Sequence, residues 1–297
     1  MMPTFFQKIT LTVLFMSAFG HSKLQILQYS SSDATMSTVS TAVIGQKEVF
    51  ILDAGFTNSA AKELISLIKN TTHLPVTKIF TTHEHPDHYF GATEILKVYP
   101  KAGLYASPIV VKKIKQTVDE KVSQWSSVYG TAEIPQVPRI PKPFRGKSIT
   151  LRGNKNEPIK LLQPLDGDSE DVTAYWIPSQ KVMITGDMVY SSKMHVWLAS
   201  ALEPSHRKGW IRSLDYLTSL KPKKVIAGHV PGTEKPEVSD IRATKEYIQY
   251  FDRHIYGKGY STQKIYDLLK NRYPNRISLD TLNRTAIAFG KSHTSPI

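Results

Sequence analysis

Apolar residues in the first third of the chain recur with the periods of strands and helices. Residues 41–55, TAVIGQKEVFILDAG, predict a strand, a turn at Gly45-Gln46 and a second strand that ends at Asp53. Residues 76–82, VTKIFTT, predict a further strand that is apolar enough to be buried. A helix is expected between them, because four apolar residues share one helical face behind a candidate N-cap at Asn58 or Ser59; they are Leu64, Ile65, Leu67 and Ile68. A strand, a helix and a strand thus lead directly into residues 82–91.

The remainder of the chain shows the same two periods. Helices are expected at residues 91–99, 107–127, 205–220, 235–256 and 261–271, with Ser205 as the N-cap of the third. Strands are expected at residues 103–107, 148–153, 159–165, 172–178, 181–187 and 223–229. Of these, 172–178 and 181–187 suit a hairpin joined by Ser179-Gln180. The proline-rich segment IPQVPRIPKPF, 134–144, cannot form regular structure and predicts a rigid crossing segment or part of a flap.

The first twenty residues, MMPTFFQKITLTVLFMSAFG, have the composition of a signal peptide. One charge, Lys8, precedes an apolar run from Ile9 to Phe19, and small residues precede His21, before which cleavage is expected. The alternative is an uncleaved membrane anchor. Because no stretch reaches the roughly 18 apolar residues of a spanning helix, no stable membrane insertion is expected after cleavage. The mature chain, residues 21–297, is then expected to be periplasmic or secreted.

Composition limits the chemistry that is open to this chain. It has 297 residues and no cysteine, so disulfides, thiolate ligands and cysteine nucleophiles are excluded. The formal net charge of +13 could attract nucleic acid or acidic substrates, but the lysines are dispersed, and the densest run is KPKK at residues 221–224. We therefore expect a small-molecule substrate and no nucleic-acid partner; composition does not indicate an oligomeric state.

Residues 82–91, THEHPDHYFG, place three histidines and an aspartate within six positions at the end of a predicted buried strand. His83 and His85 alternate on an extended backbone, so both imidazoles could reach one metal ion. Asp87 and His88 follow the turn at Pro86 and could serve a second ion. Imidazole and carboxylate are the ligands that zinc and similar divalent ions take when thiolate is absent. The carboxyl end of a strand is also where α/β sheets carry their chemistry.

HEHPDH matches the His-x-His-x-Asp-His signature of the metallo-β-lactamase superfamily. The chain also resembles that family at one earlier strand end and at two later ones. TGD provides Asp187, which in hydrolase branches of the family bridges two metal ions, and AGH provides His229, the usual last ligand of the second ion. ILDAG resembles the early Asp-Gly turn of the family, with Asp53 as a support for the ligands. The resemblance extends over about residues 24–232.

One position departs from the family pattern. Where relatives usually carry Gly-His-Thr or Gly-His-Ser, this chain reads DGDSED, so Asp168 stands at the place of the third histidine of the first metal. Asp166 and Asp171 are neighbouring alternatives. The exchange makes the first site richer in hard oxygen ligands, which favours manganese or iron somewhat, although zinc is the expected ion. It also allows a disabled first site and a mononuclear enzyme.

The resemblance implies an α/β fold, a four-layer αβ/βα sandwich with the metals at one edge. Residues 21–297 would form a single domain with an inserted segment at about 107–147 and a helical C-terminal extension at about 234–297. Seven metal ligands are implied, namely His83, His85, Asp87, His88, Asp168, Asp187 and His229. Two divalent ions would hold a bridging hydroxide that attacks the substrate. Asp87, which can hold or accept the proton of the nucleophile, and Tyr190, which can contact the substrate carbonyl, are the expected catalytic residues, although packing alone would also explain Tyr190.

Three functions are compatible with these features. The first is a hydrolase of a lactone, ester, thioester or amide, because zinc β-lactamases generally lack the carboxylate at position 187, and the chain is more similar to lactonase and glyoxalase II branches. The second is a phosphodiesterase or nuclease, and the third an iron-dependent oxidoreductase similar to sulfur dioxygenases. Aromatic and neighbouring residues could line the pocket or merely pack against the core; they are Trp125, Tyr129, Met194, His195 and Trp197.

Overall fold

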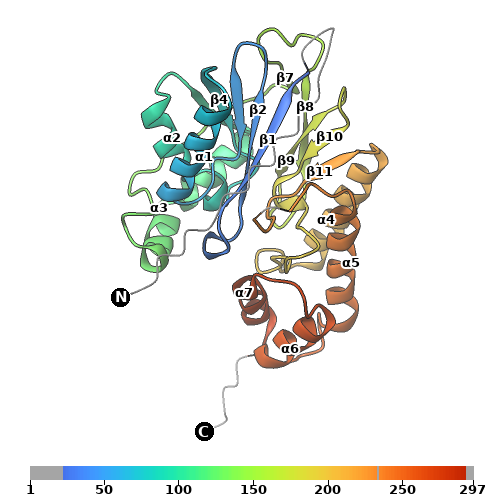
Figure 1. The fold of residues 1–297 in the computed structure, drawn as a ribbon. Helices are drawn as coiled ribbons and strands as arrows, with labels where there is room; N and C mark the ends of the chain where they lie inside the picture. The colour runs from blue at the N-terminus through green and yellow to red at the C-terminus, as the bar shows by residue number, and fades with distance from the viewer. Residues whose placement is uncertain (1–22, 233, 292–297) are drawn as a thin grey trace.

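A computed structural model describes residues 23–232 and 234–291, and the predicted signal peptide lies outside these residues. The chain forms two sheets that face each other (Figure 1). The first has the order β1 (Gln25–Ser30), β2 (Val39–Ile44), β3 (Val49–Leu52), β4 (Val76–Phe80), β5 (Gly103–Ala106) and β6 (Lys142–Pro143). The second has the order β11 (Lys224–Ile226), β10 (Val182–Ile184), β9 (Val172–Ile177), β8 (Ile159–Leu165) and β7 (Ser148–Ile149).

Helices cover the outer faces of both sheets. α1 (Asn58–Thr71), α2 (Ala92–Val98) and α3 (Pro108–Tyr129) lie outside the first sheet, and α4 (Pro204–Ser219) and α5 (Ser239–His254) lie outside the second (Figure 1). α6 (Thr262–Arg272) and α7 (Leu279–Phe289) pack together at one end of the molecule. The predicted four-layer α/β sandwich with C-terminal helices is therefore confirmed.

The two-residue period of the strands divides the apolar core between the layers. In β3, Phe50 and Leu52 belong to the core between the sheets, whereas Val49 and Ile51 pack with α1 and α2. Every residue of β3 is buried, because both faces of this strand are covered. The hairpin predicted from residues 172–187 is present, with β9 and β10 antiparallel, while β10 pairs in parallel with β11. The carboxyl ends of β3, β4, β10 and β11 thus open toward one edge of the sandwich.

Several boundaries differ from those expected. β1 was not predicted, and it adds an antiparallel edge strand to β2. The N-cap of α1 is Thr57, whose hydroxyl accepts from the Ala60 amide, because Asn58 and Ser59 instead bind Ala132 and Glu133.

Three further boundaries lie later in the chain. α4 begins at Pro204 rather than behind Ser205, since proline suits the first helical position. The strand expected at residues 148–153 is shortened to β7. The predicted helical extension did not identify α7 as a separate helix.

No helix among the described residues is both long and apolar enough to cross a lipid bilayer. Residues 134–144 are irregular except for the two residues of β6, as their proline content predicts.

A buried histidine beneath α5 gives the fold a predictable response to acid. His195 is buried, its Nδ1 atom lies 3.1 Å from the Tyr247 hydroxyl, and its Nε2 atom has no hydrogen-bond partner among the described residues. Burial, together with the charges of Arg276 and Lys270, lowers the pKa of His195 to about 3. The folded protein therefore binds fewer protons than the unfolded chain between pH 6.5 and about 3, so stability is lost as the pH falls through this window.

We expect His195→Gln to remove this pH dependence. Two pH units below the ordinary histidine pKa, the lost protonation corresponds to about 2.7 kcal/mol. The difference in unfolding free energy, wild type minus H195Q, should therefore fall by roughly that amount between pH 7.5 and pH 4.5. Urea unfolding at both pH values measures it. The exposed His73 provides the control, because the unfolding free energy of H73Q should fall between the two pH values by as much as that of wild type. Equal acid sensitivity of H195Q and wild type would contradict the assignment.

Candidate metal centre

Residues from three strand ends and one connecting loop meet at the open edge of the sandwich. The residues after β4 carry His83, His85 and the short 3-10 turn Pro86–His88. Asp168 lies between β8 and β9, Asp187 follows β10, and His229 follows β11. The structure brings all seven predicted ligands together in two groups that share Asp187. Their role as metal ligands stays a prediction.

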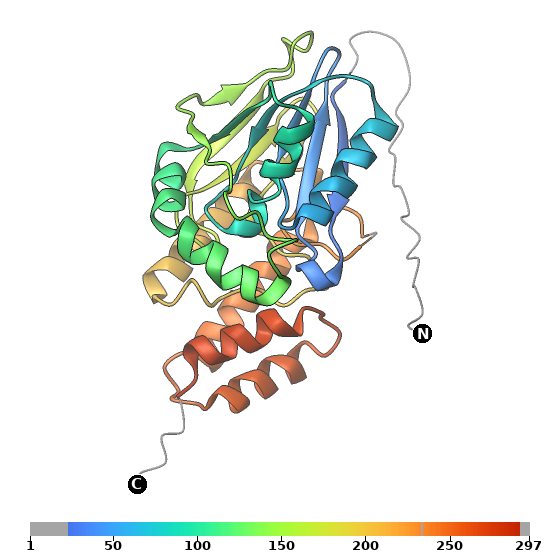
Figure 2. The same ribbon diagram turned by 90° about the vertical axis from the view of Figure 1, so that its left-hand side faces the viewer.

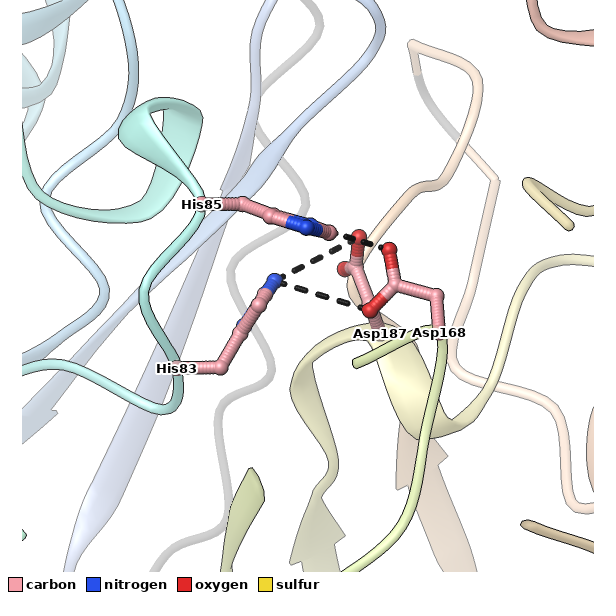
Figure 3. A group of neighbouring side chains, drawn as sticks. All are labelled: His83, His85, Asp168 and Asp187. Carbon is pink, nitrogen blue, oxygen red and sulfur yellow. Dashed lines mark ion pairs between the residues drawn. The ribbon is translucent and has the colours of Figure 1, made fainter. Parts of the chain in front are cut away.

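The first group consists of His83, His85, Asp168 and Asp187. Their ligand atoms lie within 4.8 Å of one another. His85 Nδ1 is 3.0 Å from Asp168 Oδ2, and His83 Nε2 is 3.7 Å from Asp168 Oδ1 and 3.9 Å from Asp187 Oδ2. Figure 3 shows the two imidazoles approaching from one side and the two carboxylates from the other, so that all four point into one space.

The second group consists of Asp87, His88, Asp187 and His229, again within 4.8 Å of one another. His88 Nε2 lies 3.1 Å from Asp187 Oδ1 and 3.4 Å from Asp87 Oδ2. His229 Nε2 lies 2.9 Å from Asp187 Oδ2 and 3.4 Å from Asp87 Oδ2. Two imidazoles and two carboxylates therefore surround this second space as well, and Asp187 presents one oxygen atom toward each neighbour.

Asp53, at the end of β3, orients two of the histidines from behind. Its Oδ2 atom accepts from His88 Nδ1 at 2.8 Å and from the Thr82 hydroxyl at 2.9 Å. The Thr82 hydroxyl in turn lies 2.9 Å from His83 Nδ1, so the Nδ1 proton of His83 is directed to it. Both rings consequently turn their Nε2 atoms toward the carboxylates. Hydrogen bonds of this kind fix the tautomer and orientation of metal-binding histidines, and the supporting role predicted for Asp53 agrees with this geometry.

The loop between β1 and β2 orients the second group. The Met36 carbonyl accepts from His229 Nδ1 at 2.7 Å, which leaves His229 Nε2 free to face Asp187. The Thr38 hydroxyl donates to Asp87 Oδ2 at 3.1 Å. Sequence patterns did not indicate either contact. A main-chain acceptor has no signature in the sequence, and β1, which places this loop, was not predicted.

Two glycines allow Asp187 to approach its neighbours. A Cβ atom on Gly228 would lie 2.0 Å from Asp187 Oδ1, and one on Gly186 would lie 2.6 Å from the Thr82 hydroxyl. Gly186 also has a φ angle of +52°, which favours glycine. The residues immediately before Asp187 and His229 are therefore glycine because the site is closely packed.

Four polar atoms of the two groups are buried and have no hydrogen-bond partner among the described residues. They are His83 Nε2, His88 Nε2, Asp168 Oδ1 and Asp187 Oδ1. Leaving such atoms unpaired is costly, of the order of 1–3 kcal/mol each. All four face the shared spaces, and nitrogen and carboxylate oxygen are suitable donors for divalent cations. The residues thus fit two metal ions of the kind that the sequence predicts.

The electrostatics of the site keep His83 and Asp187 in the form that this fit requires, whereas the neighbouring carboxylates, against the effect of burial, raise the pKa of His85 to about 9 and that of His88 well above its ordinary value. Burial lowers the pKa of His83 well below its ordinary value, and the neighbouring His88 and His85 lower it further, so the ring stays neutral. Burial raises the pKa of Asp187, but His229 and His88 outweigh it and hold the carboxyl well below its usual range. Asp168, which is only 1% exposed, has its pKa raised to about 6, chiefly by burial and against the attraction of His85.

Tyr190 faces the carboxylates rather than packing away from them. Its phenolic oxygen lies 2.9 Å from Asp187 Oδ2 and 3.1 Å from Asp168 Oδ2, and its ring stacks on His229 with 5.1 Å between the centroids. Burial raises the pKa of this phenol well above 10, and Asp168 and Asp187 raise it further, so it remains a hydrogen-bond donor. The position is compatible with a catalytic contact, although the ring is also part of the core, so the sequence-based role stays a prediction.

The structure distinguishes Asp168 from its two acidic neighbours. The Asp166 carboxylate lies against Gly209 of α4, and Asp171 forms an ion pair with Lys113 at 3.1 Å. Neither residue belongs to a group of potential metal ligands among the described residues. Asp168 therefore occupies the place predicted for it.

A pocket with about 550 Å³ of empty space, which includes its open mouth, adjoins both groups. Its lining comprises Met36, His85, Pro86, Asp87, Lys121, Gln124, Trp125, Asp168, Asp187, Tyr190, Trp197, Ser200, His229 and Thr281. Trp125 and Trp197, which sequence reasoning left open, line this pocket. Met194 and His195 do not, because both are buried, His195 beside Tyr247 of α5 and Met194 beside Arg276 between α6 and α7. Tyr129 packs on Phe56.

Comparison with known proteins agrees with this geometry. A family model described as the metallo-beta-lactamase superfamily matches residues 34–229. The metallo-beta-lactamase DIM-1 has a similar structure, with a TM-score of 0.57 and 19% identity over 80% of this chain and 97% of its own. TMB-1 gives 0.55 and 18% over 79% and 97%, and a metallo-beta-lactamase from Pontibacter korlensis gives 0.54 and 19% over 81% and 99%. At such identities the structural similarity shows the fold alone.

Proposed function

The chain belongs to the metallo-β-lactamase superfamily, and from this premise we propose that it is an exported hydrolase that binds two divalent metal ions and cleaves a small carbonyl substrate. Family membership and the buried histidine and aspartate groups support a metal-dependent hydrolase. The observation that carries the dinuclear proposal is the sharing of one carboxylate, Asp187, between two complete groups of ligands.

His83, His85 and Asp168 would hold one ion, Asp87, His88 and His229 the other, and Asp187 both. When bound, such ions lower the pKa of water from about 15.7 toward neutrality and polarise a carbonyl oxygen. Zinc is the expected metal because the donors are mainly imidazole and carboxylate. Manganese and iron are the alternatives, since Asp168 supplies oxygen where relatives usually supply nitrogen.

The protein groups around the ions can handle protons and orient the substrate. The Thr38 hydroxyl fixes Asp87, which lines the pocket, so this carboxylate is placed to accept a proton from an attacking water. The Tyr190 phenol, which keeps its proton, can donate to a substrate oxygen as negative charge develops there. No serine or cysteine nucleophile is needed. The shared carboxylate and the partly apolar pocket favour a lactone, ester, thioester or amide.

Metal analysis combined with a substrate panel tests this proposal. Purified protein is expected to contain about two metal ions per chain and to hydrolyse at least one lactone, ester or thioester, with activity lost to a chelator and restored by the ion. The panel should also include β-lactams and phosphodiesters. Exclusive cleavage of phosphodiesters would replace the proposal with a nuclease, and a single iron with no hydrolysis would replace it with an oxidoreductase.

Export is proposed from the sequence of residues 1–20 alone, with the periplasm or the exterior as the destination. The absence of cysteine is compatible with an oxidising compartment, because the fold does not depend on disulfides. N-terminal sequencing of protein recovered from outside the cytoplasm should begin at His21. A full-length protein retained in membranes would instead indicate the uncleaved anchor.

A further inference from the structure

Two helices that are distant in the sequence form a wall of the pocket beside the metal groups. α3 contributes Lys121, Gln124 and Trp125, and α7 contributes Thr281. Figure 2 shows α3 and the C-terminal helices at the same end of the molecule, and the Arg284 guanidinium of α7 lies 5.2 Å from the centre of the Trp125 ring. α7 lies beyond residue 229, where the match to the family model ends.

Lys121 places a positive charge in this wall. Among the described residues that line the pocket, it is the one lysine, and none is arginine. Its ammonium donates to the neutral Gln124 side chain at 3.2 Å, and the nearest carboxylate partner is Glu120 at 3.9 Å, whose side chain is 75% exposed. A solvated carboxylate at that distance neutralises little of the charge. The Lys121 side chain is 30% exposed, and its ammonium has no strong ion-pair partner among the described residues.

Aromatic side chains are held rigidly in the same pocket. Trp125 is 7% exposed and packs edge-on against Phe56, with 5.1 Å between the ring centroids, in addition to its contact with Arg284. The Trp197 indole donates to the Ser200 hydroxyl at 2.9 Å. Rigid aromatic surfaces bind apolar groups with little loss of side-chain entropy. The pocket therefore offers an apolar surface together with a single lysine ammonium and the metal groups.

We propose that the substrate carries a carboxylate that pairs with Lys121, joined by an apolar segment to the carbonyl that is cleaved. This inference rests on the proposed hydrolase function and specifies its substrate class. A carboxylate is favoured over a phosphate because Lys121 is the one lysine, with no arginine, among the described residues that line the pocket, and a phosphate ester dianion would be left partly unpaired. Lys121 is thus a specificity-determining residue, which acts away from the reacting atoms.

A pair of matched esters tests the proposal on the metal-loaded enzyme. Mono-para-nitrophenyl glutarate carries a free carboxylate, and para-nitrophenyl pentanoate has the same chain length without it. We expect the ratio of kcat/KM for the charged ester to that for the neutral ester to fall about tenfold in Lys121→Met, which corresponds to about 1.4 kcal/mol. Lys121→Arg, which keeps the charge, should retain most of the ratio. Lys115→Met, at an exposed position on the same helix, should leave both constants unchanged.

A ratio that is the same in K121M and wild type would overturn the inference, as would an equal loss in K115M. The proposed function fails differently, because wild type would then hydrolyse neither these esters nor any other carbonyl substrate of the panel. In that event the Kd of each ester, measured by calorimetry on the loaded protein, decides the matter. A charged-to-neutral preference that falls about tenfold in K121M supports the carboxylate site, and a preference unaffected by K121M overturns it.

Discussion

Replacing Asp187 with asparagine is expected to lower kcat/KM about a thousandfold and to reduce the bound metal from two ions to fewer than one per chain. The carboxylate belongs to both groups of ligands, so its loss removes an oxygen donor and a negative charge from each. The amide has the same shape, which limits the disturbance of Tyr190 and His229 around it. Elemental analysis and kinetics on the same preparation measure the two losses together.

Asp166→Asn is the matched control for this variant. Asp166 is an acidic residue in the neighbouring loop and belongs to neither group of ligands, so D166N should keep its metal and its activity. Circular dichroism of both variants shows whether each is folded. If folded D187N retained both ions, Asp187 would not be the shared ligand, and the dinuclear proposal would lose the observation on which it depends.

The architecture and the candidate ligands could be predicted because the motifs that resemble the family lie at strand ends. Strand ends are marked by an apolar run followed by a polar residue, and in an α/β sandwich such ends meet at one edge. His83, Asp187 and His229 each follow a run of this kind, so their convergence could be inferred although they are separated by up to about 150 positions. The fold and its C-terminal helices agree with that inference.

Contacts that depend on the main chain or on packing between distant helices could not be predicted in the same way. The Met36 carbonyl fixes the His229 ring, but any residue type offers a carbonyl, and 193 positions separate the two groups. Lys121 and Thr281 reach the pocket through the way α3 and α7 pack, which neither helix reveals alone. The edge strand β1 was missed because its sequence, QILQYS, alternates only weakly and its outer residues stay partly exposed.

The position of Asp168 could be predicted from the sequence only in part. The neighbouring acids Asp166 and Asp171 made its position ambiguous in the sequence, and family resemblance alone favoured the choice. The structure separates the three by their partners: Asp168 faces His85, whereas Asp171 pairs with Lys113. The Tyr190 phenol beside Asp168 could not have been placed from spacing, although its offset of three residues from Asp187 was the reason for considering it.

His85→Ala is expected to abolish measurable turnover while removing about one of the two metal ions. His85 belongs only to the first group, so Asp87, His88, Asp187 and His229 remain to hold the second ion. The His85 side chain is 20% exposed, whereas those of His83 and His88 are fully buried, so its truncation disturbs the core least. Loss of one ion removes part of the charge that activates water, which accounts for the large effect on rate.

The contrast between H85A and D187N is the sharper test, because a shared ligand and an unshared one predict different metal contents. Elemental analysis should find about one ion per chain in H85A and fewer than one in D187N, with His73→Ala as the control for removing an exposed histidine. Thermal unfolding checks that H85A is folded. Full activity of H85A with two bound ions would exclude His85 from the site, whereas loss of both ions would mean that the two groups bind metal cooperatively rather than independently.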